Sequence, residues 1–127
     1  MYNIRKHIAI FFLLLIGVDI LIVVARYGGI IGFDVVFYPP LITVFLHLYW
    51  GKSKLYSILK EKRSEILKKY HFIGWFSTWE WTIIKAASAE NDELLKKIRN
   101  DVIAINLLSL LIMPNMIVMF NLVKLIN

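Results

Sequence analysis

The chain has 127 residues, of which 59% are hydrophobic, and its mean hydropathy is +0.67. Soluble domains are about 45–50% apolar, and a soluble fold of this size leaves much of its chain in contact with water. The composition therefore argues against a soluble domain and indicates a single membrane domain over residues 1–127. The chain has no cysteine, which excludes disulfides, thiolate metal sites and thiol nucleophiles.

The first predicted membrane span covers about residues 8–26, and only Asp19 interrupts its apolar core. At 1.5 Å per residue this core is about 27 Å long, close to the roughly 30 Å of a bilayer interior. The run is longer than the apolar part of a signal peptide, and no small-x-small cleavage pattern follows it. We therefore expect an uncleaved anchor, followed by a tight turn at Gly28 and Gly29.

A second apolar run covers residues 30–50, with Pro39 and Pro40 at its centre. Each proline removes a backbone donor and clashes with the preceding turn, so the pair predicts a kink or a break in the helix. The segment either crosses the bilayer or enters and leaves it on the same side. A crossing is the favoured interpretation, which gives three spans in place of two.

The middle of the chain, residues 51–101, is polar and is predicted to be helical and cytoplasmic. Its first part, residues 51–70, has seven Lys or Arg residues against two Glu and carries apolar residues at helical spacing. Residues 77–80 (STWE) have the spacing of a capping box, which predicts a short helix over residues 78–88. We expect this helix to lie near the membrane interface, although packing on the preceding helix is an alternative. The expected interfacial residues are Trp75, Trp79 and Trp81.

The last apolar run, residues 102–123, is the clearest continuous span, and Pro114 is expected to kink it beyond its middle. Together these elements predict an all-α integral membrane protein with two to three transmembrane helices, of which three is the favoured number.

The distribution of basic residues predicts the orientation of the chain, because Lys and Arg favour the cytoplasmic side of short loops. Eleven of the 15 Lys and Arg residues lie in residues 51–101, and Arg5 and Lys6 precede the first span. The predicted outer turn holds only Arg26, and the C-terminal tail holds only Lys124. We therefore expect a multi-pass protein of the cell inner (plasma) membrane, with its N-terminus and residues 51–101 in the cytoplasm.

The net charge of +6 indicates contact with anionic lipid headgroups, which attract basic residues near the surface by about 1 kcal/mol each. No basic fold module or base-stacking motif is visible, so nucleic acid is not an expected partner.

Asp19 is the most informative single residue, because it lies about 17 Å from the inner end of its span, near the membrane midplane. An ionised carboxylate is costly there, so it must be paired, protonated or in a wet cavity. The favoured interpretation is a packing contact with Asn106 or Asn115 of the third span. The alternative is a proton or ion path. Asp34, in the outer part of the second span, is a further candidate for such intramembrane polar contacts.

Histidines and catalytic motifs give no sign of a cofactor or an active site. His47 is expected at the interface, and a haem held by two histidines is not expected because His7 and His71 lie outside the predicted apolar segments. No nucleophile elbow, phosphate-binding glycine loop or zinc-protease motif occurs. We therefore expect no enzymatic activity, no metal and no cofactor.

Residues 79–111 resemble part of a family of small bacterial membrane proteins similar to universal stress protein B. In that family, a helix that ends near an acidic motif, Asp followed by Asp or Glu and then Leu, leads into a basic turn that contains an Arg and then into a C-terminal span. Here residues 91–94 (NDEL) and 96–99 (KKIR) occupy those places. The resemblance covers about a quarter of the chain and implies a stress-linked inner-membrane protein without known enzymatic activity. Unlike that family, this chain has an additional apolar segment with Pro39 and Pro40.

Three hypotheses for function follow. The first is a non-enzymatic inner-membrane protein that acts by contact with another membrane protein or with itself, with residues 51–101 as the regulatory surface. The second is an immunity protein against a pore-forming bacteriocin, since such proteins resemble this chain in size, basic charge, three spans and orientation. The third is a small ion or proton carrier that works as an oligomer, and it depends on Asp19 alone.

Overall fold

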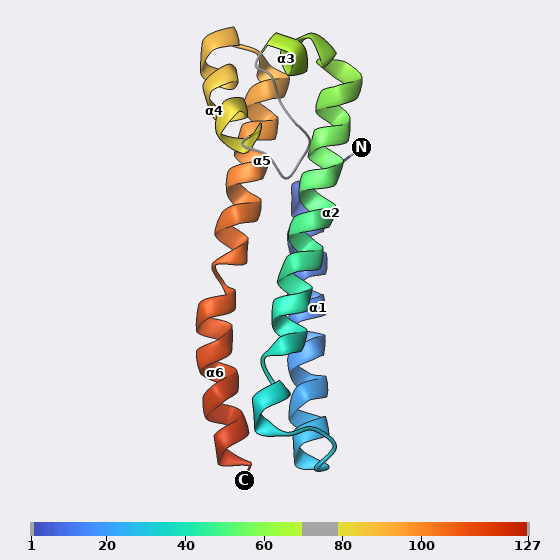
Figure 1. Ribbon diagram of the computed structural model, residues 1–127, viewed down its shortest axis with the longest axis vertical. Coiled ribbons are helices and arrows are strands. Elements are labelled where there is room, and N and C mark those ends of the chain that lie inside the picture. Colours follow the sequence, from blue (N-terminus) through green and yellow to red (C-terminus); the bar gives the residue numbers. More distant parts are fainter. Residues whose placement is uncertain (1, 70–78, 127) are drawn as a thin grey trace. The chain divides into compact units, whose positions relative to one another are not determined.

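The computed structural model describes residues 2–69 and 79–126, and within these ranges it contains helices and no strand. The predicted all-α class is therefore confirmed. In chain order the elements are α1 (Ile4–Tyr27), the 3₁₀ helix η1 (Phe33–Val35), α2 (Tyr38–Lys62), α3 (Ser64–Lys69), α4 (Trp79–Glu90), α5 (Glu93–Ser109) and α6 (Ile112–Leu125) (Figure 1). Two helical segments, Ile4–Tyr27 and Glu93–Leu125, are long and apolar enough to cross a membrane.

The end of α1 is set by the two glycines that follow it. Gly29 has a φ of 71°, a left-handed conformation that glycine adopts without steric cost. The backbone N–H of Gly29 donates to the carbonyl of Arg26, and that of Ile30 donates to the carbonyl of Ala25. These two bonds form a Schellman motif, which pairs the last carbonyls of the helix and turns the chain.

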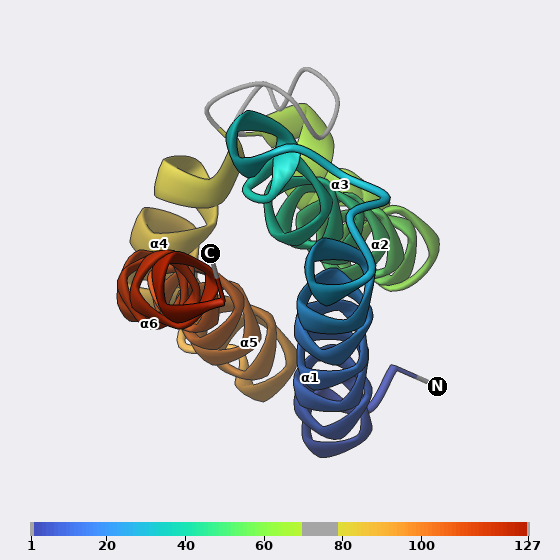
Figure 2. The same ribbon diagram turned by 90° about the horizontal axis from the view of Figure 1, so that it is seen from below.

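The helix predicted over residues 30–50 begins too early, because α2 starts at Tyr38. Pro39 and Pro40 lie in its first turn, where the N–H groups that they lack would have no partner inside the helix. Of the predicted kink or break, the structure therefore has the break, and the prolines lie at the start of the helix that follows it. Figure 2 shows the connection between α1 and α2 from below, with η1 in it.

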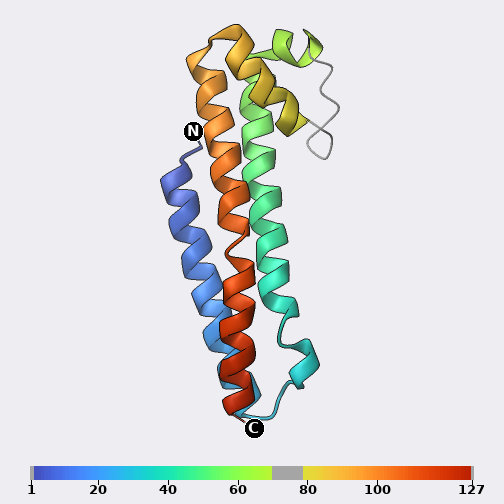
Figure 3. The ribbon, with the colours of Figure 1, turned by 90° about the vertical axis from the view of Figure 1, so that its left-hand side faces the viewer.

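The third apolar run is also divided. Helix α5 ends at Ser109 and α6 begins at Ile112, which Figure 3 shows as a break in the ribbon. Pro114 has no N–H to donate to the carbonyl of Leu110, four residues earlier. That carbonyl instead accepts from the N–H of Met113 at 3.2 Å. The helix is therefore interrupted one turn before Pro114, near the middle of the predicted span.

The predicted middle helices have different bounds in the structure. The helix expected over residues 51–70 is the second part of α2 followed by the short α3, with Arg63 between them. The helix expected over residues 78–88 is α4. Trp75 and the residues that precede α4 lie outside the described residues, as do the side chains of Trp79 and Trp81.

The chain divides into two compact units, each with its own core. The charged unit consists of Met1–Ile4 and Leu48–Leu107, and the apolar unit consists of Arg5–His47 and Leu108–Asn127. The charged unit holds 11 of the 15 Lys and Arg residues and seven of the nine Asp and Glu residues. Its largest buried cluster contains Tyr2, Leu55, Leu59, Ile66, Ile83, Ala86, Ala87, Leu95, Ile98, Val102 and Ile105.

The apolar unit buries only a narrow stripe of its side chains. One cluster contains Ile22, Val36, Met119 and Val123. Among the described residues, 24 large hydrophobic side chains are exposed, and 21 of them belong to this unit. They include Leu13 and Leu21 of α1, at 72% and 68%, and Ile117 of α6, at 63%. The two units thus differ in what they expose, one charged groups and the other hydrocarbon.

Candidate functional site

Three polar side chains of the apolar unit are linked by hydrogen bonds. His7 of α1 and His47 of α2 are hydrogen-bonded through Nε2 and Nδ1, and their ring centroids are 4.6 Å apart. The other nitrogen of His47, Nε2, lies 2.9 Å from the hydroxyl oxygen of Ser109, at the end of α5. These hydrogen bonds therefore join side chains from three helices.

The buried stripe of α1 explains why His7 points inward. His7, Phe11 and Leu15 follow one another at four-residue spacing, which places them on one face of a helix. His7 is 0% exposed and His47 is 6% exposed. The ring of Phe11 lies 4.3 Å from that of His47, centroid to centroid, so the pair has an apolar neighbour.

The hydrogen-bond chain can run in either direction, because each neutral imidazole has one donor and one acceptor and a hydroxyl can be both. In one arrangement His7 Nε2–H donates to His47, and His47 Nε2–H donates to Ser109. In the other, Ser109 donates to His47 Nε2 and His47 Nδ1–H donates to His7. Both arrangements satisfy the facing nitrogen atoms.

The histidine pair corrects one statement made from the sequence. His7 was placed outside the apolar segments and apart from His47, but α1 begins at Ile4, includes His7 and brings it into contact with His47. The position of His47 at the membrane interface stays a prediction; the structure shows that its side chain is buried and contacts His7, Phe11 and Ser109. The signal in the sequence was the four-residue spacing of His7, Phe11 and Leu15, which becomes visible once the helix is started before the apolar run.

A second polar contact in the apolar unit joins α1 to α6. The side-chain amide of Asn115 donates to Asp19 Oδ1 at 3.2 Å. This is one of the two pairings left open by the sequence. Asn106 lies in α5 within the charged unit and is half-buried, whereas Asp34 lies in η1 and is exposed. Asp34 is therefore not inside a continuous second span, because the helix begins only after it.

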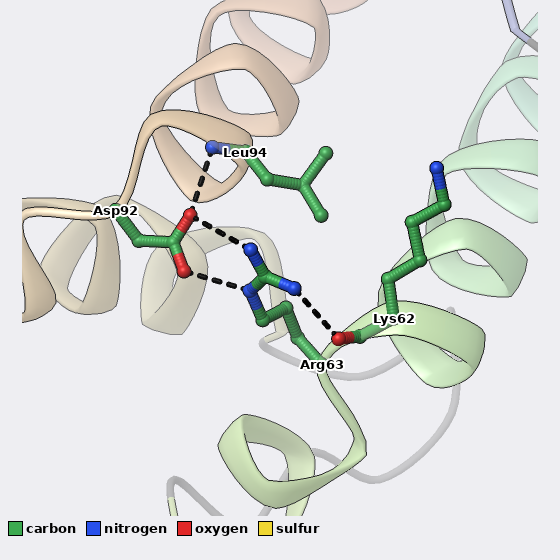
Figure 4. A network of polar contacts seen from close by, with 4 residues as sticks. All are labelled: Lys62, Arg63, Asp92 and Leu94. Carbon is green, nitrogen blue, oxygen red and sulfur yellow. Dashed lines mark hydrogen bonds and ion pairs between the residues drawn. The ribbon is translucent and has the colours of Figure 1, made fainter.

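The charged unit has its own polar contact, between Arg63 and Asp92 (Figure 4). Arg63 Nε donates to Asp92 Oδ2 at 2.7 Å, and its Nη2 donates to Oδ1 at 3.4 Å. Asp92 also caps α5, since its Oδ1 accepts from the backbone N–H of Leu94 at 2.8 Å. The contact thus ties the α2–α3 junction to the α4–α5 turn.

This contact was missed from the sequence. The available signal was the pair Asn91 and Asp92 directly before a helical pattern. Asn91 has a φ of 49°, a left-handed conformation that asparagine tolerates, and Asp is a favoured cap. The hydrogen bond from Arg63 lowers the pKa of Asp92, and the backbone N–H of Leu94 acts in the same direction.

Among the described residues, no group of three or more His, Cys, Asp or Glu side chains is placed to hold a metal ion. In comparisons with models of protein families, with curated proteins and with solved structures, nothing matches this chain. Inferences about its function therefore depend on the geometry of the two units.

Replacing Asp19 with Leu should leave membrane insertion intact, because at a helix centre Asp costs about 3 kcal/mol more than Leu. The contact between α1 and α6 should weaken, because Asn115 loses its acceptor. A double-mutant cycle of Asp19→Leu and Asn115→Ala, measured by unfolding in detergent micelles, should give a coupling energy of about 0.6–1.7 kcal/mol.

Asn121 provides the matched control, since its amide donates to the carbonyl of Ile117 in its own helix. The cycle of Asp19→Leu with Asn121→Ala should give a coupling near zero. Equal coupling in the two cycles would show that the bond to Asn115 does not hold α1 and α6 together.

Replacing Asp92 with Asn should destabilise the charged unit at neutral pH but not in acid. The lowered pKa means that the ionised form stabilises the fold above the ordinary aspartate value of about 3.9, and this is lost as the pH falls through the lowered pKa. Asparagine keeps the capping oxygen, so the change removes mainly the charge. Urea unfolding at several pH values should show a difference that disappears in acid. Glu93→Gln, at a neighbouring exposed position, should show a much smaller difference at neutral pH, and an equal one would contradict this interpretation.

Proposed function

We propose that the chain is an integral inner-membrane protein without enzymatic activity, which acts by contact with another membrane protein. The observation that carries the membrane location is the exposed hydrocarbon of the apolar unit. Only 17% of the most apolar window of α1 is buried, and 22% of that in Glu93–Leu125. A soluble protein would bury such segments in its core, whereas lipid solvates them directly.

In this proposal the protein crosses the membrane three times. Helix α1 and the predicted span over residues 102–123, which holds the end of α5 and α6, are two of the crossings, and residues 30–50, which include the first part of α2, are the third. The exposed Asp34 of η1 then lies at the outer surface, where a carboxylate can stay hydrated. Residues 51–101, which make up most of the charged unit, lie on the cytoplasmic side, as the excess of Lys and Arg favours.

The charged unit is the proposed surface for the partner and for anionic lipid headgroups. Its cations are numerous, and those near a membrane surface contribute about 1 kcal/mol each to binding anionic lipid. Asp19 accepts a hydrogen bond from Asn115, which supports a packing role for Asp19 over a transport path. A link to the stress response has its only support in the resemblance of residues 79–111.

Photo-cross-linking in growing cells tests the proposed partner. A photoreactive amino acid placed at the exposed positions Lys54, Lys60 or Lys85 of the charged unit should give an adduct with one defined membrane protein. The same amino acid at Leu13 or Leu21 of the apolar unit should give no adduct with that protein, because lipid surrounds these positions.

Deletion of the gene should reproduce the phenotype of losing the partner. Absence of any protein adduct from the charged unit, together with a deletion that has no effect under envelope stress, would contradict action through a partner. Adducts from positions in the apolar unit alone would show that the partner contacts the apolar unit and not the charged unit.

A further inference from the structure

We propose that Tyr49, Lys52 and Tyr56 of α2 form a binding site for the phosphate group of an anionic phospholipid in the inner leaflet. This inference rests on the proposed function, because it needs the membrane location and the cytoplasmic side of residues 51–101. It deepens that function by naming the lysine that binds the lipid and the two neighbours that hold the headgroup with it. The ligand is one lipid molecule at a defined position, and not a diffuse layer of headgroups around all the cations.

The three side chains are neighbours on one face of a continuous helix. Helix α2 runs from Tyr38 to Lys62 without interruption, and all three residues belong to the charged unit. Lys52 follows Tyr49 by three residues and precedes Tyr56 by four. Side chains at these two spacings are adjacent on the surface of a helix. The helix therefore places a lysine between two tyrosines along this face.

The position of this face along α2 matches the headgroup level. The predicted second span ends at residue 50, so Tyr49 lies at its inner end and Lys52 directly follows it. By the helix rise, Lys52 lies about 4.5 Å beyond Tyr49, while the headgroup region of one leaflet is roughly 5–8 Å thick. The Cα–Cβ bonds of a helix tilt toward its N-terminus, so Tyr56 leads back toward the span. Tyrosine is also common at this level, because its ring is apolar and its hydroxyl is polar.

The exposure of these side chains suits a site with a fixed position. Tyr49 is 54% exposed, whereas Lys52 and Tyr56 are partly exposed. A lysine that is already partly packed has lost some of its rotamer freedom, so it loses less when it binds. Its ammonium group has three N–H donors and each phenol has one O–H donor, which match the acceptor oxygens of a phosphate.

The charge of this part of α2 favours an anionic ligand. Residues 38–60 contain three lysines, at positions 52, 54 and 60, and no Asp or Glu. The first acidic residue of the helix is Glu61, nine residues after Lys52. An acidic protein segment has the same charge, but the apolar run directly before this face favours a lipid. The acyl chains of a lipid can lie beside that run while its phosphate stays near the lysine.

Lys54 provides a matched control within the same helix. It is exposed and lies at nearly the same depth as Lys52, but residues two apart are about 200° apart around a helix, so it faces another side. The aromatic residue one turn before it, Trp50, packs its ring against that of Tyr2, with centroids 6.2 Å apart. Lys54 therefore has the charge of Lys52 without tyrosines at the neighbouring positions of α2.

Native mass spectrometry of the full chain in detergent tests the site, with phosphatidylglycerol as the titrated lipid. Lys52→Gln should weaken binding of the first lipid molecule about fivefold, which is the contribution of one cation near a headgroup. Lys52→Arg should retain the affinity, and Lys54→Gln should leave it nearly unchanged. The double variant Tyr49→Phe and Tyr56→Phe should also bind more weakly, because it keeps both rings but loses the two hydroxyl donors. Circular dichroism should show the same helix content in each variant.

An equal loss of affinity in Lys52→Gln and Lys54→Gln would overturn the proposal, because diffuse charge would then explain the binding. Equally tight binding of phosphatidylcholine, which has the phosphate but no net charge, would also overturn it. Displacement of the lipid by an equal concentration of inorganic phosphate would show that a free anion, and not a lipid, is the ligand.

A photoreactive phenylalanine analogue in place of Tyr49 tests the same ligand in growing cells. It should give an adduct with phospholipid, and an adduct with a protein in its place would overturn the choice of a lipid. Failure of these tests would leave the membrane location untouched, because alkaline extraction of cell membranes tests that separately. The partner contact is likewise tested separately, by the adducts from Lys60 and Lys85.

Discussion

Polar groups in apolar surroundings must find their hydrogen-bond partners within the protein, and this constraint explains most of the polar contacts described in the apolar unit. Helices satisfy the backbone, and a Schellman motif closes α1 where the chain must turn. The polar side chains follow the same rule, because Asp19 accepts from Asn115 and the two histidines bond each other and Ser109. Each of these contacts also joins different helices, so satisfying a polar group and packing the unit are achieved together.

The charged unit differs from the apolar unit in that its surface is polar and its apolar side chains are buried in a core, which is assembled from several helices. Residues at 0% exposure, such as Leu59 of α2, Ile83 of α4 and Leu95 of α5, meet in one cluster. The junctions between these helices are held by the bond of Arg63 to Asp92 and by an ion pair of Lys69 with Glu90. A unit built in this way can present charge to lipid headgroups or to a protein partner.

Much of this fold is visible in the sequence, since length and hydropathy alone identify the long segments of α1 and α5–α6. The glycine turn after α1 is also a local property. Pro39 and Pro40 were expected to kink or break the run of residues 30–50, and the structure has the break, with α2 beginning at Tyr38. The sequence left these alternatives open because two prolines can either interrupt a helix or begin one, and packing decides which. His7 was missed because hydropathy marks where a helix is apolar and not where it starts. The cap that Asp92 forms on α5 has a local signal, but the pairing of Asp92 with Arg63, 29 residues away, has none.

Accessibility of single spin labels in lipid bilayers tests most directly that the exposed hydrocarbon of the apolar unit contacts lipid. Labels at Leu21 and Ile117 should be relaxed by oxygen, which concentrates in the bilayer interior, and protected from a water-soluble nickel reagent. Labels at Lys54 and Lys97, in the charged unit, should show the reverse. Equal access of the nickel reagent to all four positions would contradict a membrane location for the apolar unit.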